Sequence, residues 1–202
     1  MSPPRRRALL LGAASALLLP FGVQAGTQAE EALADAVRTA LSAAIASAAP
    51  PKLSFVDADA RLAFLRWQLA MSERLKRRKT EAVTRIEFLE TLWYEATRAR
   101  LEPALVLALV EVESGFRKYA ISPAGARGYM QVMPFWARQI GDGDAARLFH
   151  LQTNLRFGCV ILRHYLELEL GDLMLALGRY NGSRGRMEYP TAVLSGRQRW
   201  QL

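Results

Sequence analysis

One glutamate lies at the end of an unusually apolar stretch. Glu113 follows residues 104–110, which are apolar without exception. A surface helix needs a polar face, so a helix over this run must be enclosed by the rest of the fold. Burial and the partial negative charge of a helix C-terminus both disfavour an ionised carboxyl, so we expect a raised pKa for Glu113. A carboxylic acid that stays protonated near neutral pH is suited to protonate a leaving-group oxygen.

The limits of this helix are marked in the sequence. Pro103 suits the first helical position, and Gly115 suits the left-handed position just after the end. Glu111 is not a partner for Glu113, because residues two apart on a helix point about 200° apart. An exposed glutamate at a frayed helix end would give the same local pattern, so the helix alone leaves both interpretations open.

Four short motifs follow one another from Glu113 onward. They are Glu113-Ser114, Gly128-Tyr129-Met130-Gln131, Asn154-Leu155-Arg156-Phe157-Gly158 and Arg179-Tyr180-Asn181-Gly182. In this order and at these spacings, the chain resembles the catalytic domain of the soluble lytic transglycosylases, relatives of goose-type lysozyme that cleave bacterial cell-wall glycan. The resemblance covers roughly residues 83–190, and four motifs in register are specific although each alone is weak.

The resemblance implies a reaction with one catalytic carboxyl. Glu113 would protonate the oxygen between N-acetylmuramic acid and N-acetylglucosamine and then, ionised, take the proton of the sugar's 6-hydroxyl as a 1,6-anhydro ring closes. The N-acetyl group of the sugar would stabilise the developing oxocarbenium ion. Goose-type lysozymes carry supporting aspartates in this region, whereas this chain has no acidic residue between Glu113 and Asp142. A goose-type hydrolase and a non-catalytic wall-binding protein of a secretion or conjugation machine are the alternatives.

Roles for other residues are also implied by the resemblance. Ser114 would orient the catalytic carboxyl, with a helix-end cap as the alternative role. Met130 would line the substrate groove, and Gln131 would hydrogen-bond a sugar amide. Tyr180 would donate a hydrogen bond to Glu113, and Asn181 completes the same motif.

A second group of motif residues is expected to be structural. It consists of Gly128, Asn154 and Gly158, with Asn154 as a helix cap. Two positions depart from the family pattern: Tyr129 replaces a leucine and Arg179 replaces an alanine. Aromatic side chains that could stack on sugar rings, or simply form core, are Phe116, Tyr119, Phe135, Trp136 and Tyr189.

Composition excludes several other chemistries. His150 and His164 are the only histidines and Cys159 is the only cysteine, so we expect no metal site and no cofactor. No Gly-x-Ser-x-Gly or phosphate-binding loop is present. The formal charge is +8 and falls to +5 without the three arginines Arg5–Arg7, which suits an anionic wall and does not indicate nucleic acid.

The chain divides into three segments. Residues 1–25 have the layout of a secretory signal peptide, with three arginines, an apolar run over 8–19 and a small-residue site ending at Ala25. The apolar run is too short to span a bilayer, so we expect a periplasmic or secreted protein without a transmembrane segment; Arg6-Arg7 leaves the export route open. Residues 26–79 are expected to be a helical extension and residues 80–202 the catalytic domain.

Hydrophobic periodicity predicts a mostly α, lysozyme-like fold. Residues 26–49 carry a thin apolar stripe, and residues 59–78 form a helix with Leu62, Leu65, Leu69 and Leu75 facing inward. Further helices are expected over 80–100, 103–114, 134–141, from Thr153 or Asn154 to 170, and 172–181, with a loop or short hairpin over 122–128. Cys159 is expected to be buried on one face of the helix before residue 170.

Overall fold

A computed structural model describes residues 28, 30–46 and 52–202, so the expected signal peptide lies outside the described residues. The helices are α1 (Asp35–Ala46), α2 (Ala58–Leu75), α3 (Ala82–Arg98), α4 (Pro103–Ser114), α5 (Pro134–Ile140), the short 3-10 helix η1 (Ala145–Phe149), α6 (Leu151–Leu168), α7 (Leu173–Asn181) and α8 (Glu188–Arg199). The only strand-like pairing in the described part consists of isolated bridges from Arg127 to Ile121 and Val132. The prediction of a mostly α fold is confirmed.

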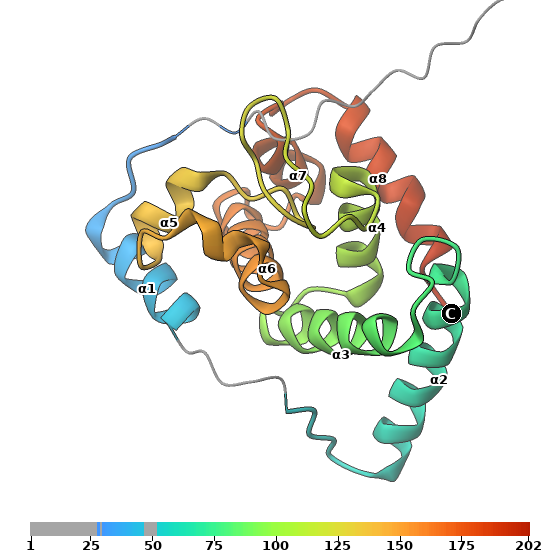
Figure 1. Cartoon of the computed structure of the whole chain (residues 1–202). Helices are drawn as coiled ribbons and strands as arrows, with labels where there is room; N and C mark the ends of the chain where they lie inside the picture. Colours follow the sequence, from blue (N-terminus) through green and yellow to red (C-terminus); the bar gives the residue numbers. More distant parts are fainter. Residues whose placement is uncertain (1–27, 29, 47–51) are drawn as a thin grey trace, which may run out of the picture.

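Helix α4 is the central element of the bundle (Figure 1). Residues 104–110 are buried without exception, as predicted. Pro103 occupies the first turn, and Gly115 ends the helix with a φ of 57°. Helix α8 packs along α4 and approaches it closely, because a Cβ on Gly196 would lie only 3.3 Å from the Cβ of Ala108.

Helix α6 forms the second long element of the core. It packs against α3 and α7, and Cys159 on its inner face is buried, as predicted. An ion pair between Arg156 and Glu95 joins α6 to α3 at 2.7 Å, and both side chains are almost fully buried. A buried carboxylate needs such a partner, because removing one member of a buried pair typically costs about 3–5 kcal/mol.

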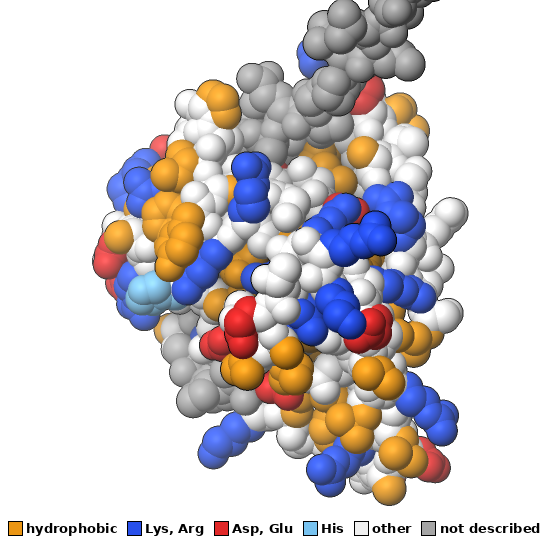
Figure 2. Space-filling model, turned by 45° about the vertical axis from the view of Figure 1, so that its right-hand side comes forward, with side chains coloured by type: hydrophobic (Ala, Val, Ile, Leu, Met, Phe, Trp, Pro, Cys, Tyr) orange, Lys and Arg blue, Asp and Glu red, His pale blue; other side chains and the backbone are white. Residues whose placement is uncertain are grey.

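The buried face of α2 differs from the prediction. Leu62, Leu65 and Leu69 were expected to face inward, yet they are 49%, 44% and 68% exposed. The buried residues of α2 are Phe64, Trp67, Met71 and Leu75. The aromatic face of α2 is the buried one because it packs on Trp93 of α3, whose ring centroid lies 4.7 Å from that of Trp67. The three leucines lie on the outer side of α2. Figure 2 shows hydrophobic side chains on the lower part of the molecule, with Lys and Arg side chains near them.

Some helices and helix boundaries differ from those predicted from the sequence. Helix α6 begins at Leu151 with His150 as its N-cap residue, so the prediction that Thr153 or Asn154 caps this helix is wrong. Helix α8 and η1 were not predicted. The predicted start of α5 at Pro134 and the cap of α7 by Asp172 are confirmed, since the Asp172 carboxylate accepts from the backbone N–H of Leu175 at 3.0 Å.

The N-terminal part of the described chain leans on the domain. Helix α1 packs on α5 and α6, and Leu41 is its buried residue. Gln28 is buried as well: it accepts a hydrogen bond from the Trp136 indole at 2.8 Å and donates one to the backbone carbonyl of Tyr180. In the part of the chain that the structure describes, none of the helices has the length and apolar character needed to cross a membrane.

Candidate active site

Glu113 lies in the last turn of α4, where the sequence placed it. Its side chain is buried, with 6% of the residue exposed. The two carboxyl oxygens differ: Oε1 accepts a hydrogen bond from the Tyr189 hydroxyl at 2.5 Å, while Oε2 is buried and has no hydrogen-bond partner among the described residues. One oxygen is therefore held in place, and the other is a buried acceptor without a partner among the described residues.

The environment of Glu113 favours the protonated acid. Burial raises the pKa of Glu113 to about 8, and the hydrogen bond from Tyr189 opposes that rise. The expected direction follows from the loss of water around the carboxylate, which removes its main source of stabilisation. At neutral pH Glu113 is accordingly a neutral acid with a proton to give.

Glu111 serves a different purpose two residues earlier. Its carboxylate lies 2.7 Å from Arg78 and 3.0 Å from Arg199, and it accepts a hydrogen bond from the Trp200 indole at 2.8 Å. It points away from Glu113, as the helical geometry predicted. Glu111 fastens the end of α8 to α4, so it is a structural anchor.

The hydrogen bond to Glu113 comes from Tyr189 and not from Tyr180. The predicted hydrogen bond from Tyr180 to Glu113 is wrong, because the Tyr180 hydroxyl donates to the backbone carbonyl of Met130 at 2.7 Å. Tyr189, considered only as a stacking face or core residue, supplies the bond to Glu113. Tyr180 still lies near the site: burial raises the pKa of its hydroxyl, and the charge of Glu113 adds to that rise.

The loop between α4 and α5 is held by hydrogen bonds from the Gln131 side chain to the backbone of the same loop. Gln131 donates from Nε2 to the carbonyls of Gly128 at 2.9 Å and Ala120 at 3.1 Å. Met130 is fully buried, so the prediction that it lines the substrate groove is wrong. Tyr129, the departure from the family pattern, is buried and accepts a hydrogen bond from Lys79 at 2.7 Å.

Asn154 fixes this loop from α6. Its Oδ1 accepts from the Met130 backbone N–H at 2.8 Å, and its Nδ2 donates to the carbonyls of Arg127 at 2.8 Å and Leu148 at 2.7 Å. Asn154 is therefore structural, as predicted, but through these loop contacts and not through a helix cap. All three bonds are buried or partly buried, so an aliphatic residue at this position would leave polar groups unsatisfied.

Two glycines permit the close approach of loop and helix. Gly128 has a φ of 76°, and a Cβ there would lie 2.6 Å from the Leu148 carbonyl oxygen and against the Asn154 side chain. A Cβ on Gly158 would lie 2.6 Å from the Met130 Cε. Both glycines are thus required by packing, which agrees with their expected structural role.

The remaining motif residues support the same framework. The Ser114 hydroxyl donates to the carbonyls of Tyr129 at 2.7 Å and Val110 at 3.1 Å, so it ties the end of α4 to the loop. The prediction that Ser114 orients the Glu113 carboxyl is wrong, because its hydroxyl is directed to these backbone carbonyls. Asn181 is buried at the end of α7 and donates to the Ser183 hydroxyl at 3.0 Å.

The aromatic residues considered for sugar stacking are mostly core. The buried ones are Phe116, Phe135, Trp136 and Tyr189, and Tyr119 is exposed. Within the described residues, no group of three or more His, Cys, Asp or Glu side chains is arranged to hold a metal ion.

Comparisons with known proteins identify the family of this part of the chain. A family model described as the transglycosylase SLT domain matches residues 91–195, just over half of the chain. A membrane-bound lytic murein transglycosylase C from Actinobacillus pleuropneumoniae is 43% identical over 84 residues, covering 36% of this chain and 23% of that protein. A transglycosylase of Enterobacteria phage PRD1 is 30% identical over 104 residues, covering 52% of this chain and 38% of that protein. The chain thus spans well under half the length of the curated relatives it matches.

Two solved structures resemble the chain. They are the lytic transglycosylase Slt of Pseudomonas aeruginosa (TM-score 0.44, 24% identity, 70% of this chain and 27% of that chain) and a 70-kDa soluble lytic transglycosylase in complex with bulgecin A (TM-score 0.45, 19% identity, 68% and 24%). The family match contains Glu113, the loop of Gln131, Asn154, Tyr180 and Tyr189 within its limits. This chain belongs to the transglycosylase SLT domain family.

Proposed function

We propose that the protein is an exported peptidoglycan lytic transglycosylase that cleaves the β-1,4 bond between N-acetylmuramic acid and N-acetylglucosamine. Family membership and the names of the curated relatives support the substrate class. The observation that carries the proposal is the Glu113 carboxyl itself. It is protonated at neutral pH, oriented through Oε1, and free at Oε2 among the described residues.

In the first step Glu113 acts as the acid. The proton of its carboxyl passes to the glycosidic oxygen, the bond from that oxygen to C1 of the N-acetylmuramic acid breaks, and the N-acetyl group of the same sugar stabilises the oxocarbenium ion. Protonation of the leaving group is required because an alkoxide is a poor leaving group. A pKa of about 8 keeps most Glu113 carboxyls protonated at neutral pH.

In the second step the same residue acts as the base. The Glu113 carboxylate takes the proton from the 6-hydroxyl, and that oxygen bonds to C1 to close the 1,6-anhydro ring. The newly formed carboxylate is buried, so it needs the hydrogen bond from Tyr189 while it exists. The proton returns to Glu113, and no water is consumed.

The single carboxyl favours this route over hydrolysis. Hydrolysis by inversion needs a second carboxylate to activate water. Burial and the Tyr189 hydroxyl account for the shift in the Glu113 pKa, with no contribution from another carboxylate among the described residues. This supports a reaction in which the substrate supplies its own nucleophile and its own stabilising group.

Contacts with the glycan are part of the proposal. The amide nitrogen of Gln131 is already engaged by two carbonyls, so its Oε1 is the end that can accept a sugar amide N–H. Exposed Tyr119 offers the stacking face that the buried aromatic residues do not. Export through the signal peptide, and service to general wall turnover or to a secretion or conjugation apparatus, are proposed from the sequence.

Digestion of purified peptidoglycan tests the reaction. We expect muropeptides ending in 1,6-anhydro-N-acetylmuramic acid by mass spectrometry, and a loss of about 10²- to 10⁴-fold in turnover for Glu113→Gln. Products with reducing ends would assign the chain to the hydrolases. No turnover by the wild type, together with retained glycan binding, would favour the wall-binding alternative.

A further inference from the structure

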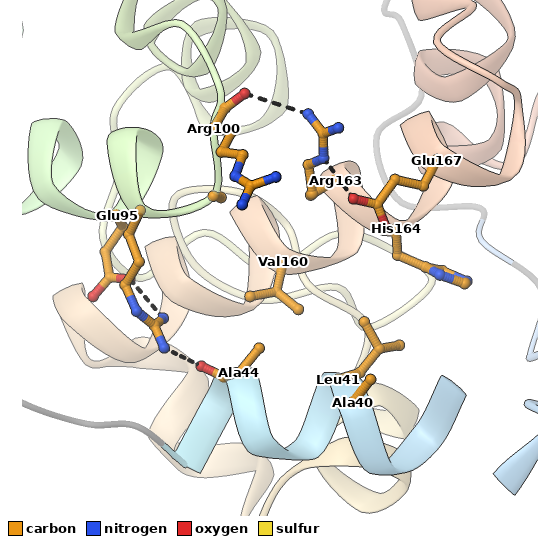
Figure 3. A pocket seen from close by; sticks show the side chains of 11 residues that line it. Ala40, Leu41, Ala44, Glu95, Arg100, Val160, Arg163, His164 and Glu167 are labelled. Atoms are coloured by element: carbon orange, nitrogen blue, oxygen red, sulfur yellow. Dashed lines mark hydrogen bonds and ion pairs between the residues drawn. The ribbon is translucent and has the colours of Figure 1, made fainter. Parts of the chain in front are cut away.

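A cavity away from Glu113 lies between α1, α3 and α6 (Figure 3). Its volume is about 390 Å³, which is within the range of small-molecule pockets. Arg100, on its lining, precedes the start of α4, whereas Glu113 lies in the last turn of that helix. At 1.5 Å per residue, α4 separates the two places by about 15 Å. The cavity is therefore not a subsite of the proposed catalytic centre.

One side of this cavity is apolar. Leu41 and its alanine neighbours on α1 face Val160 on α6 across the opening (Figure 3). Leu41 is buried, and Val160 is 8% exposed. These side chains can pack against an aliphatic group but cannot form hydrogen bonds with a ligand.

The other side of the cavity carries arginines, and their hydrogen bonds and ion pairs show which of them could bind a ligand. Arg98 donates to the Ala44 carbonyl at 2.6 Å and lies 3.6 Å from Glu95, a carboxylate that Arg156 already binds from within the core. Arg98 thus closes the gap between α3 and α1 and is not available to a ligand.

Two further arginines lie above Val160. Arg163 bonds Glu167 at 2.9 Å and reaches the Arg100 carbonyl at 3.4 Å. The guanidinium of Arg100 has no hydrogen-bond or ion-pair partner among the described residues, and Figure 3 shows it extending into the cavity beside Arg163. Arg100 is an exposed residue, so its charge lies at the edge of the cavity, whose lining also includes the carboxylates of Glu95 and Glu167.

The backbone holds Arg100 in a defined position. Its φ is 55°, and the bonds from Arg100 N–H to the Thr97 carbonyl at 3.0 Å and from Leu101 N–H to the Ala96 carbonyl at 2.8 Å close the end of α3 as a Schellman motif. Glycine is the usual residue at this left-handed position. The chain places a cation there, at the mouth of a cavity with one apolar side.

We propose that this cavity binds a small amphipathic anion, with its carboxylate or phosphate on the Arg100 and Arg163 guanidinium groups and its aliphatic part against Leu41 and Val160. A guanidinium binds either anion through paired N–H donors. His164 adds a ring on the flank, and burial lowers its pKa, so it is neutral at pH 7. Ligand binding here would also fasten α1 to the domain.

Titration of the ¹⁵N-labelled protein with four probes tests the proposal. Sodium octanoate and octyl phosphate, both below their micelle concentrations, are expected to shift the amide signals of Leu41, Arg100 and Val160. Inorganic phosphate and 1-octanol are expected to bind at least about tenfold more weakly, because each lacks one half of the ligand. The ratio between octanoate and octyl phosphate decides which anion the site prefers.

Arg100→Gly provides a variant that keeps the fold. Glycine suits the left-handed position, so the melting temperature should not fall, while affinity for octanoate and octyl phosphate should fall about tenfold or more with the loss of the charge-assisted hydrogen bonds. Arg77→Gln, which removes the same charge from an exposed position after α2, should leave affinity unchanged. Inorganic phosphate or 1-octanol binding as tightly as the amphiphiles would overturn the proposal. So would unchanged affinity in Arg100→Gly, or signal shifts confined to other elements.

Discussion

Replacing Glu113 by glutamine should make the protein more stable at neutral pH. In the unfolded chain the Glu113 carboxyl ionises near pH 4.5, whereas in the fold its pKa is about 8. Its contribution to folding is therefore fully present below pH 4.5 and is lost as the pH rises toward 8. At pH 7 the difference of 2.5 pH units from 4.5 corresponds to about 3 kcal/mol of lost stability. Glutamine avoids that loss because its amide does not ionise.

The measurement is urea or thermal unfolding of both proteins across pH 4 to pH 8. The two unfolding free energies should be close at pH 4 and should differ by about 3 kcal/mol at pH 7, which for a domain of this size is a melting-temperature gain of roughly 6–12 °C. The gain should be accompanied by loss of turnover, because the amide has no proton to give. A Glu113→Gln protein no more stable than the wild type at pH 7 would refute the raised pKa of Glu113.

Glu111→Gln is a matched control on the same helix. Although burial acts in the other direction, hydrogen bonds from Trp200, Arg199 and Arg78 hold the pKa of Glu111 below its ordinary value. Its contribution is therefore present above the unfolded pKa and is lost on acidification. Glu111→Gln should be less stable than the wild type at pH 7, and the gap should narrow as the pH falls below about 4.5. If the unfolding free energy rises in Glu113→Gln and falls in Glu111→Gln at pH 7, the stabilisation cannot be a general effect of removing a negative charge from this helix.

Three further substitutions test the site and its support. Tyr189→Phe removes a hydrogen bond that favours ionised Glu113, so the alkaline limb of the pH–rate profile should move to higher pH while peak turnover falls; an unmoved limb would contradict the contact. Gly158→Ala should destabilise the fold by about 1–3 kcal/mol in urea unfolding, because the new methyl group meets the Met130 side chain. Asn154→Ala should cost about 1–3 kcal/mol or more and should increase amide exchange at Met130, whose N–H loses its acceptor; unchanged exchange would show that the loop does not depend on this contact.

The central helix could be predicted because its signals are local. An apolar run between Pro103 and Gly115 has one reasonable structure, and it places Glu113 at a buried helix end without further information. The starts of α5 and α7 could be predicted for the same reason, since proline in the first turn and aspartate at the N-cap act within a few residues.

The orientation of α2 could not be decided in this way. Leu62, Leu65 and Leu69 form one helical stripe, while Phe64, Trp67 and Met71 form another with the same spacing. Both satisfy the period of an amphipathic helix. The choice depends on Trp93, a residue of another helix that packs on the aromatic stripe.

The partner of Glu113 was missed for a related reason. Tyr189 lies 76 residues further along the chain, on a helix whose sequence contains Pro190 within its first turn and little apolar periodicity. Tyr180 carried a recognisable motif and was assigned the contact instead. Only the packing of α8 on α4 brings the Tyr189 hydroxyl to the carboxyl, and that packing depends on the small residues Gly196 and Ala108.

The buried position of Gln28 has a practical consequence for producing the protein. This side chain bridges the Trp136 indole and the Tyr180 carbonyl, and Tyr180 in turn holds the carbonyl of Met130. A recombinant fragment cut back to residue 35 would leave the Trp136 N–H without its acceptor, next to the loop that supports the active site. An affinity tag fused directly ahead of Gln28 would begin at a buried contact, so a tag should not be placed there.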